Sequence, residues 1–218
     1  MGETRGSRLP SRHSNPFATC WTRPGALAFQ FAAGDSLEQL VARFEAAGSR
    51  GAILGPHGSG KSTLLETIKP RLAQAGWNVA AVALRAGARR LPPGFLQLAL
   101  GAARPLVIVD GYEQLTFASR CRLWMRCRWA AAGLLVTSHA PVGIPVIHRT
   151  QVTRALALKL VSTLTQPNTS LISLDDVAAS HASCGSNLRE LFFALYLRHE
   201  ALVASPGRAA QTATAAAT

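Results

Sequence analysis

The segment from Gly55 to Ser62, GPHGSGKS, constrains the fold of this chain more than any other part of its sequence. It fits the pattern G-x-x-x-x-G-K-[ST], a loop whose backbone N–H groups surround a phosphate. Glycine suits such a loop because a Cβ atom would obstruct its tight curvature. Lys61 then reaches the β- and γ-phosphates of a nucleotide. We expect the phosphates to contact Gly55, Pro56, His57, Gly58, Ser59, Gly60, Lys61, Ser62 and Thr63.

The residues on either side of this loop have the patterns of a strand and a helix. Residues 52–54, AIL, form a short apolar run typical of buried parallel strands, and residues 63–68 have apolar residues at helical spacing. A strand, the loop and a helix therefore follow one another in the order that phosphate binding requires. The helix N-terminus adds positive potential where the phosphates lie. The sequence predicts a nucleotide-binding site at the end of this strand.

A second apolar run ends in a carboxylate. Residues 105–109, PLVIV, have the pattern of a buried strand, and Asp110 follows at its carboxyl end, where open α/β sheets bind ligands. Mg²⁺ prefers oxygen ligands and accompanies nucleotides in phosphoryl-transfer sites. We therefore predict that the Ser62 hydroxyl and the Asp110 carboxylate hold Mg²⁺, directly or through water.

These two motifs resemble the Walker A and Walker B motifs of P-loop NTPases. Residues 110–114, DGYEQ, resemble the D-G-h-D-E strand ending of NACHT and other STAND ATPases, and more loosely that of AAA+ and other proteins of the additional-strand (ASCE) division. In those families an acidic residue after the magnesium aspartate orients or deprotonates the attacking water. Gly111 directly follows Asp110 here, so the resemblance implies that Glu113 is the catalytic base. The alternatives are that Glu113 only caps a helix, or that Gln114 positions the water.

The same families place a further strand between the two Walker strands. It ends in a polar residue, sensor 1, that contacts the γ-phosphate. Residues 134–139, LLVTSH, are similar, so Thr137, Ser138 and His139 are candidates, with His139 or Ser138 favoured. The alternative for His139 is a capping or surface histidine.

Residues 185–189, GSNLR, resemble the G-N-h-R element of AAA+ and STAND lids. The arginine of that element, sensor 2, contacts the nucleotide phosphates, and the resemblance implies this role for Arg189. Ser186 interrupts the pattern. The alternative is a helix-capping turn with a structural arginine.

The order of the expected elements predicts the fold class. We expect an α/β protein with the three-layer P-loop NTPase fold, a parallel sheet of about five strands and a short C-terminal helical lid. The chain divides into a disordered basic leader (1–16), an NTPase core with an N-terminal strap (17–150), a helical subdomain (151–203) and a disordered tail (204–218). The predicted strands span 52–54, 78–84, 105–110, 134–139 and 145–150, and the predicted helices span 36–47, 63–75, 95–103, 113–132, 152–164, 173–183 and 187–203.

Three segments keep more than one interpretation. The aromatic-rich strap, residues 17–31, either covers the core or forms a wall of the adenine pocket, since P-loop ATPases commonly take base contacts from upstream residues. The helix at 113–132 mixes arginine with tryptophan, which favours nucleic-acid binding, but its spacing also fits an amphipathic helix with solvated arginines. The basic segment 85–90 either contacts phosphate or a partner, or is a solvated loop.

Composition limits the class of protein. The formal net charge is +12, but only three of the basic residues are lysine, and the excess of Arg, Ala and Gly points to biased codon usage. The charge still predicts attraction to polyanions at low salt. The four cysteines lack a C-x-x-C spacing, so we expect reduced and mostly buried thiols. No apolar run is long enough to span a membrane and no secretory signal is recognisable, so we expect a cytoplasmic protein.

These patterns predict binding of ATP and Mg²⁺-dependent hydrolysis of ATP to ADP and phosphate. ATP is favoured over GTP because no guanine-recognition motif, [NT]-K-x-D, is present. The alternatives are a small-molecule P-loop kinase, an ATP-switched nucleic-acid-binding protein and a regulatory protein with little turnover. The expected partners are ATP and either a protein or a nucleic acid bound weakly through the arginine-rich surface. The whole-chain pattern is also similar to that of small bacterial P-loop ATP-binding proteins.

Overall fold

The computed structural model describes residues 15–165 and 171–204. These residues form two compact units. One unit is the continuous segment Leu27–Gln151, and the other combines the residues up to Ala26 with those from Val152 onwards. The predicted leader up to residue 14 and the predicted tail from residue 205 lie outside the described residues.

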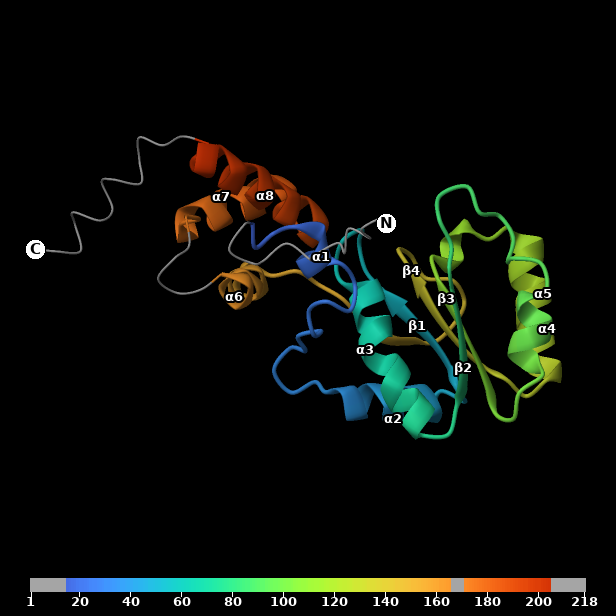
Figure 1. Cartoon of the computed structure of the whole chain (residues 1–218). Helices are drawn as coiled ribbons and strands as arrows, with labels where there is room; N and C mark the ends of the chain where they lie inside the picture. Colours follow the sequence, from blue (N-terminus) through green and yellow to red (C-terminus); the bar gives the residue numbers. More distant parts are fainter. Residues whose placement is uncertain (1–14, 166–170, 205–218) are drawn as a thin grey trace, which may run out of the picture. The chain divides into compact units, whose positions relative to one another are not determined.

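A five-stranded parallel sheet forms the centre of the Leu27–Gln151 unit (Figure 1). β4 lies between β3 and β1 and pairs with both, which confirms the additional strand that the family resemblance implied. The spatial order is β2-β3-β4-β1-β5, with β1 at Arg50–Leu54, β2 at Asn78–Ala83, β3 at Pro105–Asp110, β4 at Gly133–Ser138 and β5 at Val146–Arg149.

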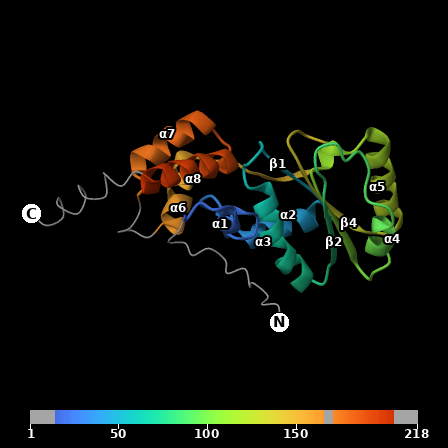
Figure 2. The same cartoon turned by 45° about the horizontal axis from the view of Figure 1, so that its top comes forward.

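Helices cover both faces of this sheet (Figures 1 and 2). α2 (Leu37–Ala46) and α3 (Lys61–Gln74) pack on one face, whereas α4 (Phe95–Leu100) and α5 (Phe117–Trp129) pack on the other. Successive residues of a strand point to opposite faces. β3 therefore gives residues 106 and 108 to the first apolar core and residues 107 and 109 to the second. The predicted three-layer arrangement is confirmed.

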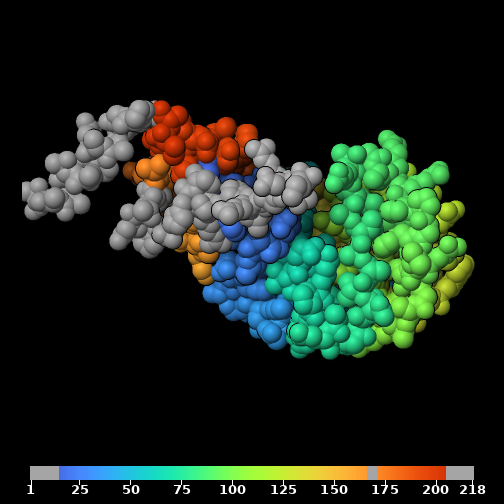
Figure 3. Space-filling view, in the orientation of Figure 1, coloured from blue at the N-terminus to red at the C-terminus, as the bar shows by residue number. Residues whose placement is uncertain are grey.

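β2 forms one edge of the sheet, and β1, which ends at the Gly55–Ser62 loop, lies further inside. Asn78, Ala81 and Ala83 of β2 are exposed, whereas residues 105–109 of β3 are all buried. In the space-filling view this edge lies between the teal surface of α3 and the green surface of the segment after β2 (Figure 3). β3, β4 and β1 thus form the most buried part of the sheet.

The helix that we expected to start at Glu113 begins later. Tyr112–Gln114 form a single 3₁₀ turn, η1, after which the backbone extends through Leu115. Thr116 then caps α5 by accepting a hydrogen bond from the N–H of Ser119. Thr116 is a good N-cap residue, and this local hydrogen bond determines where the helix begins. Glu113 consequently lies in a tight turn rather than in the first turn of α5.

The second unit contains short helix α1 (Thr19–Thr22) together with α6 (Arg154–Leu164), α7 (Leu174–Cys184) and α8 (Leu188–Ala204). α6 packs against α7, and α7 packs against α8. The strap that we predicted as one segment of the core is divided. Its residues up to Ala26 belong to this unit, whereas Phe29 and Phe31 pack on the apolar core of α2 and α3.

Asn15 belongs to the folded part of this second unit. Its Nδ2 donates hydrogen bonds to Oε1 of Glu200 at 2.6 Å and to the carbonyl oxygen of Tyr196 at 3.3 Å. The predicted leader therefore extends no further than residue 14, because the amide of Asn15 finds partners on α8 that lie far away in the sequence.

Cys20, Cys121, Cys127 and Cys184 are free thiols, but only Cys127 is buried and the others are half-buried, contrary to our expectation. Among the helices that the structure describes, none combines the length and apolar character needed to cross a membrane.

Candidate phosphate-binding site

The loop Gly55–Ser62 joins the end of β1 to the start of α3. Its buried Ser59 donates a hydrogen bond to the Pro56 carbonyl at 2.8 Å, and Ser59 Oγ lies 2.6 Å from Oγ1 of Thr150. Thr150 is also buried, and its N–H donates to the Leu54 carbonyl at 2.8 Å. Thr150 could not be predicted as part of the site, because no sequence motif marks a residue that contacts the loop only through tertiary structure.

Lys61 lies inside the site. The side chain is only 8% exposed, and its Nζ donates to the carbonyl oxygens of Gly55 and Pro56, both at 2.7 Å. Burial lowers the pKa of this ammonium from its ordinary value, and the carboxylates of Glu113 and Asp110 oppose the shift. The lysine and the two carboxylates therefore belong to one electrostatic site.

Asp110 is held by two hydroxyl groups. Ser62 Oγ donates to its Oδ2 at 2.7 Å, and Thr137 Oγ1 donates to its Oδ1 at 2.5 Å. Thr137 also accepts a hydrogen bond from the N–H of Gly111 at 2.9 Å. The predicted pair of Ser62 and Asp110 thus meets at the carboxyl ends of the strands, and Thr137, at the end of β4, orients the Asp110 carboxylate.

Gly111 explains why no carboxylate directly follows Asp110. Its φ is +84°, and a Cβ atom built on it would lie 3.0 Å from the carbonyl oxygen of Leu84. A side chain at this position is therefore strained as well as crowded. The η1 turn instead brings the next acidic side chain, Glu113, back to the site.

Glu113 and His139 form a pair beside Lys61. His139 Nε2 lies 3.0 Å from Glu113 Oε1, and His139 Nδ1 lies 3.2 Å from Lys61 Nζ. Nε2–H donates to the carboxylate, whereas Nδ1 faces both Lys61 Nζ and the carbonyl oxygen of Gly55, which lies 3.1 Å from it. The second oxygen, Glu113 Oε2, is buried and has no hydrogen-bond partner among the described residues.

The remaining predicted site residues, Ser138, His57 and Gln114, have different neighbours from those of Thr137 and His139. Ser138 is buried and its hydroxyl donates to the carbonyl of Ala140 at 2.7 Å, so this side chain shapes the turn after β4. The ring of His57 lies against that of His139, with centroids 3.6 Å apart and ring planes tilted by 38°. Gln114 is the last residue of η1. Of the three strand-end candidates, Thr137 and His139 contact other predicted site residues.

Arg189 belongs to the other compact unit, near the start of α8. The Asn187 side chain accepts hydrogen bonds from the N–H groups of Arg189 and Glu190 at 3.2 and 3.4 Å. This geometry is that of a helix-capping turn, which was the alternative interpretation. A contact between Arg189 and phosphate stays a prediction.

Phe29 lies beside the loop. Its ring comes within 3.5 Å of the position that a Cβ on Gly60 would occupy, and it makes an edge contact with His148 at 5.7 Å between ring centroids. Phe29 packs on the α2–α3 core, as a segment that covers the core would, and it also borders the loop, as a wall of an adenine pocket would. Its role as an adenine contact stays a prediction.

The residues present fit a magnesium ion. Mg²⁺ is usually bound through one or two protein oxygens together with phosphate oxygens and water. Ser62 and Asp110 supply a hydroxyl and a carboxylate oxygen 2.7 Å apart, at the first turn of α3 and the end of β3. The hydrogen bond from Thr137 leaves Oδ2 as the oxygen of Asp110 that faces Ser62.

A Thr137→Val variant tests the support of Asp110. Valine keeps the shape but leaves the Gly111 N–H and one carboxylate oxygen without their partner, so we expect a loss of about 1–3 kcal/mol in the free energy of unfolding. Urea denaturation measures this loss. The control is Thr67→Val, because the one hydrogen bond of the Thr67 hydroxyl within the described part of the chain goes to the Thr63 carbonyl in its own helix. Equal losses in the two variants would contradict the assigned role of Thr137.

Comparison with known proteins identifies the fold. No protein-family model matches the sequence, and no similar sequence was found among curated proteins. The solved structure of a DNA replication initiation factor matches with a TM-score of 0.52 and 16% identity over 75% of this chain and 60% of that one. AMPPCP-bound DnaA from Aquifex aeolicus matches with a TM-score of 0.50, again with 16% identity over 75% of this chain and 60% of that one. The chain thus spans 60% of the length of both structures, and it shares their fold, which here is a three-layer α/β arrangement around a five-stranded parallel sheet.

Proposed function

We propose that this protein binds ATP with Mg²⁺ and hydrolyses it to ADP and phosphate. The observation that carries the proposal is the hydrogen bond between Ser62 and Asp110 at the carboxyl end of β3. Lys61, His139 and Glu113 lie beside this pair and contact one another in that order. One structure with the same fold holds AMPPCP, an ATP analogue, which supports a nucleoside triphosphate as the ligand.

Binding and charge neutralisation come from the loop and from α3. The backbone N–H groups of Gly55–Ser62 and the ammonium of Lys61 bind the phosphate oxygens and offset the charge that develops on them. Ser62 and Asp110 would hold Mg²⁺, which makes the γ-phosphate a better electrophile when it is bound.

Glu113 is the residue that activates the attacking water in this proposal. His139 occupies Oε1 of this carboxylate, whereas Oε2 is buried and accepts no hydrogen bond from the described residues. A buried oxygen without a partner is costly, and a rotation of the partly exposed carboxylate that lets a water molecule donate to Oε2 removes that cost. Glu113 then orients this water and takes its proton as the water oxygen bonds to the γ-phosphorus, while the bond from that phosphorus to the bridging oxygen breaks and ADP leaves. His139 positions the carboxylate and links it to Lys61.

The experiment that tests the proposal compares wild-type protein with Lys61→Ala. We expect wild-type protein to bind ATP and release phosphate in a Mg²⁺-dependent manner. Loss of the charge-assisted contacts of Lys61 should weaken ATP binding by about 10- to 100-fold. Calorimetry measures the affinity, and a phosphate-release assay measures turnover.

The matched control is Lys69→Ala, which removes a lysine from the same helix. Lys69 pairs with Glu66 at 2.6 Å on the outer side of α3, so its loss should leave ATP affinity unchanged. Equal affinities for Lys61→Ala and wild type would contradict the phosphate-binding role of the loop. ATP binding without any turnover by wild-type protein would contradict the hydrolase assignment.

A further inference from the structure

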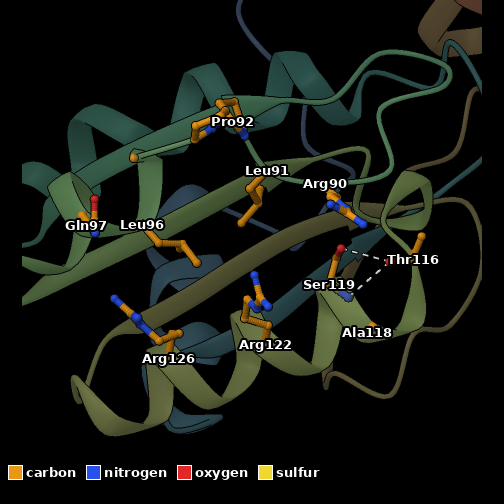
Figure 4. Close-up of a pocket in the computed structure, with 12 residues that line it drawn as sticks. Arg90, Leu91, Pro92, Leu96, Gln97, Thr116, Ala118, Ser119, Arg122 and Arg126 are labelled. Atoms are coloured by element: carbon orange, nitrogen blue, oxygen red, sulfur yellow. Dashed lines mark hydrogen bonds between the residues drawn. The ribbon is translucent and has the colours of Figure 1, made fainter.

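A cavity of about 380 Å³ lies between α5 and the segment that leads from β2 into α4. This volume is in the range of small-molecule sites. Figure 4 shows Arg122 and Arg126 on α5 along one side of the cavity, with Leu91 and Leu96 across from them. None of the residues that we assign to phosphate, Mg²⁺ or catalysis in the loop site lines this cavity.

The cavity is lined by three arginines and by no acidic residue. They are Arg90, Arg122 and Arg126. Among the described residues, none of these guanidinium groups has an ion-pair or hydrogen-bond partner. Arg120 on the same helix is different, because it donates to the carbonyls of Leu115 and Glu113 at 3.0 and 2.8 Å. The three cavity arginines therefore retain their capacity to bind an anion.

The two walls of the cavity are tied together. The N–H of Thr116 and the hydroxyl of Ser119 both donate to the carbonyl of Arg89, at 3.2 and 3.1 Å. This carbonyl immediately precedes Arg90, so the wall that carries Arg90 is fixed to the first turn of α5. Arg122 and Arg126 follow on one face of the same helix, because residues four apart are neighbours on its surface. The fold thus gathers the three positive charges around one space.

We propose that this cavity binds a small molecule that carries a phosphate group. Guanidinium groups match the oxygens of phosphate and carboxylate in bidentate hydrogen bonds. A phosphate monoester carries a charge of about −1.5 to −2 near neutral pH, which offsets three clustered arginines better than one carboxylate does. Leu91, Leu96, Pro92 and Pro93 supply apolar surface for the remainder of the ligand. This site is separate from the loop site, and its test does not depend on ATP hydrolysis.

Phenyl phosphate is the probe, because it joins a phosphate to a small apolar group. It is titrated calorimetrically into wild-type protein, into the cavity variant Arg122→Gln/Arg126→Gln and into the control Arg128→Gln/Arg154→Gln. The control removes the same charge from exposed positions that do not line the cavity. Glutamine is a good helix former, so the variants should keep the fold, which circular dichroism verifies. We expect wild type and control to bind equally and the cavity variant to bind at least about 10-fold more weakly.

Each other outcome would overturn the proposal. Equal binding by the cavity variant would place phenyl phosphate elsewhere, for example in the Gly55–Ser62 loop. Equal affinity for benzoate would remove the preference for phosphate, and no binding by wild-type protein would remove the site. If only a single-stranded oligonucleotide binds, and the cavity variant loses that binding, the arginines belong to a nucleic-acid surface instead.

Discussion

A Glu113→Gln protein is expected to bind ATP with wild-type affinity and to hydrolyse it about 100- to 10,000-fold more slowly, the usual contribution of a general base. Glutamine keeps the length of the side chain, and its amide oxygen still accepts a hydrogen bond from His139 Nε2. It cannot take a proton from water at the position of Oε2. Calorimetry and a phosphate-release assay on the same samples should therefore show an unchanged affinity for ATP and a reduced rate of turnover.

The control for this experiment is Glu66→Gln on the outer side of α3. Glu66 is exposed and pairs only with Lys69 among the described residues, so turnover should stay at the wild-type rate. If Glu113 has only a structural role, the Glu113→Gln variant should lose stability in urea but keep its turnover. That result would exclude Glu113 as the base.

A Gly55→Ala protein is expected to be strongly destabilised. A Cβ on Gly55 would lie 2.0 Å from Thr150 Oγ1, 2.7 Å from Ser59 Oγ and 2.8 Å from the Thr150 backbone oxygen. The added methyl group overpacks a buried site and breaks the contact between Ser59 and Thr150. We expect a loss of about 3 kcal/mol or more in the free energy of unfolding, measured by urea denaturation.

Two further variants make this expectation sharper. In Gly101→Ala the nearest atom to the new Cβ is the Gln97 carbonyl oxygen at 3.4 Å, so the loss should be below about 1 kcal/mol. Gly55→Ala/Thr150→Ala removes the closest clashing atom, and its loss should be smaller than the sum of the two single losses. Additive losses would show that the clash with Thr150 is not the cause.

The fold and the main pair of the site could be predicted because local patterns specify them. Apolar runs mark the strands, and the carboxyl ends of parallel strands meet at one edge, which brings Ser62 and Asp110 together. The additional strand came from the family resemblance rather than from periodicity. The late start of α5 was missed, because the Thr116 cap competes locally with a helix that begins at Glu113.

The contacts within the site depend on register, which the sequence does not specify to one residue. Val109 of β3 pairs with Val136 of β4, so the next residues along the strands, Asp110 and Thr137, lie side by side. A shift by one residue would place a different strand-end candidate beside Asp110. The sequence could therefore offer Thr137, Ser138 and His139 only as alternatives. The cavity near α5 was equally hidden, since its arginines come from two separate segments.

The arrangement of the two units also determines the order in which the chain can fold during synthesis. Residues 27–151 are continuous, so this unit is complete as soon as its last strand has left the ribosome. The hydrogen bond between Asn15 and Glu200 can form only after Glu200 has been synthesised, 185 residues later. At translation rates of 5–20 residues per second this delay is roughly 10–40 s. The sheet and the Gly55–Ser62 loop can thus form before the helix that contacts Asn15 has been synthesised.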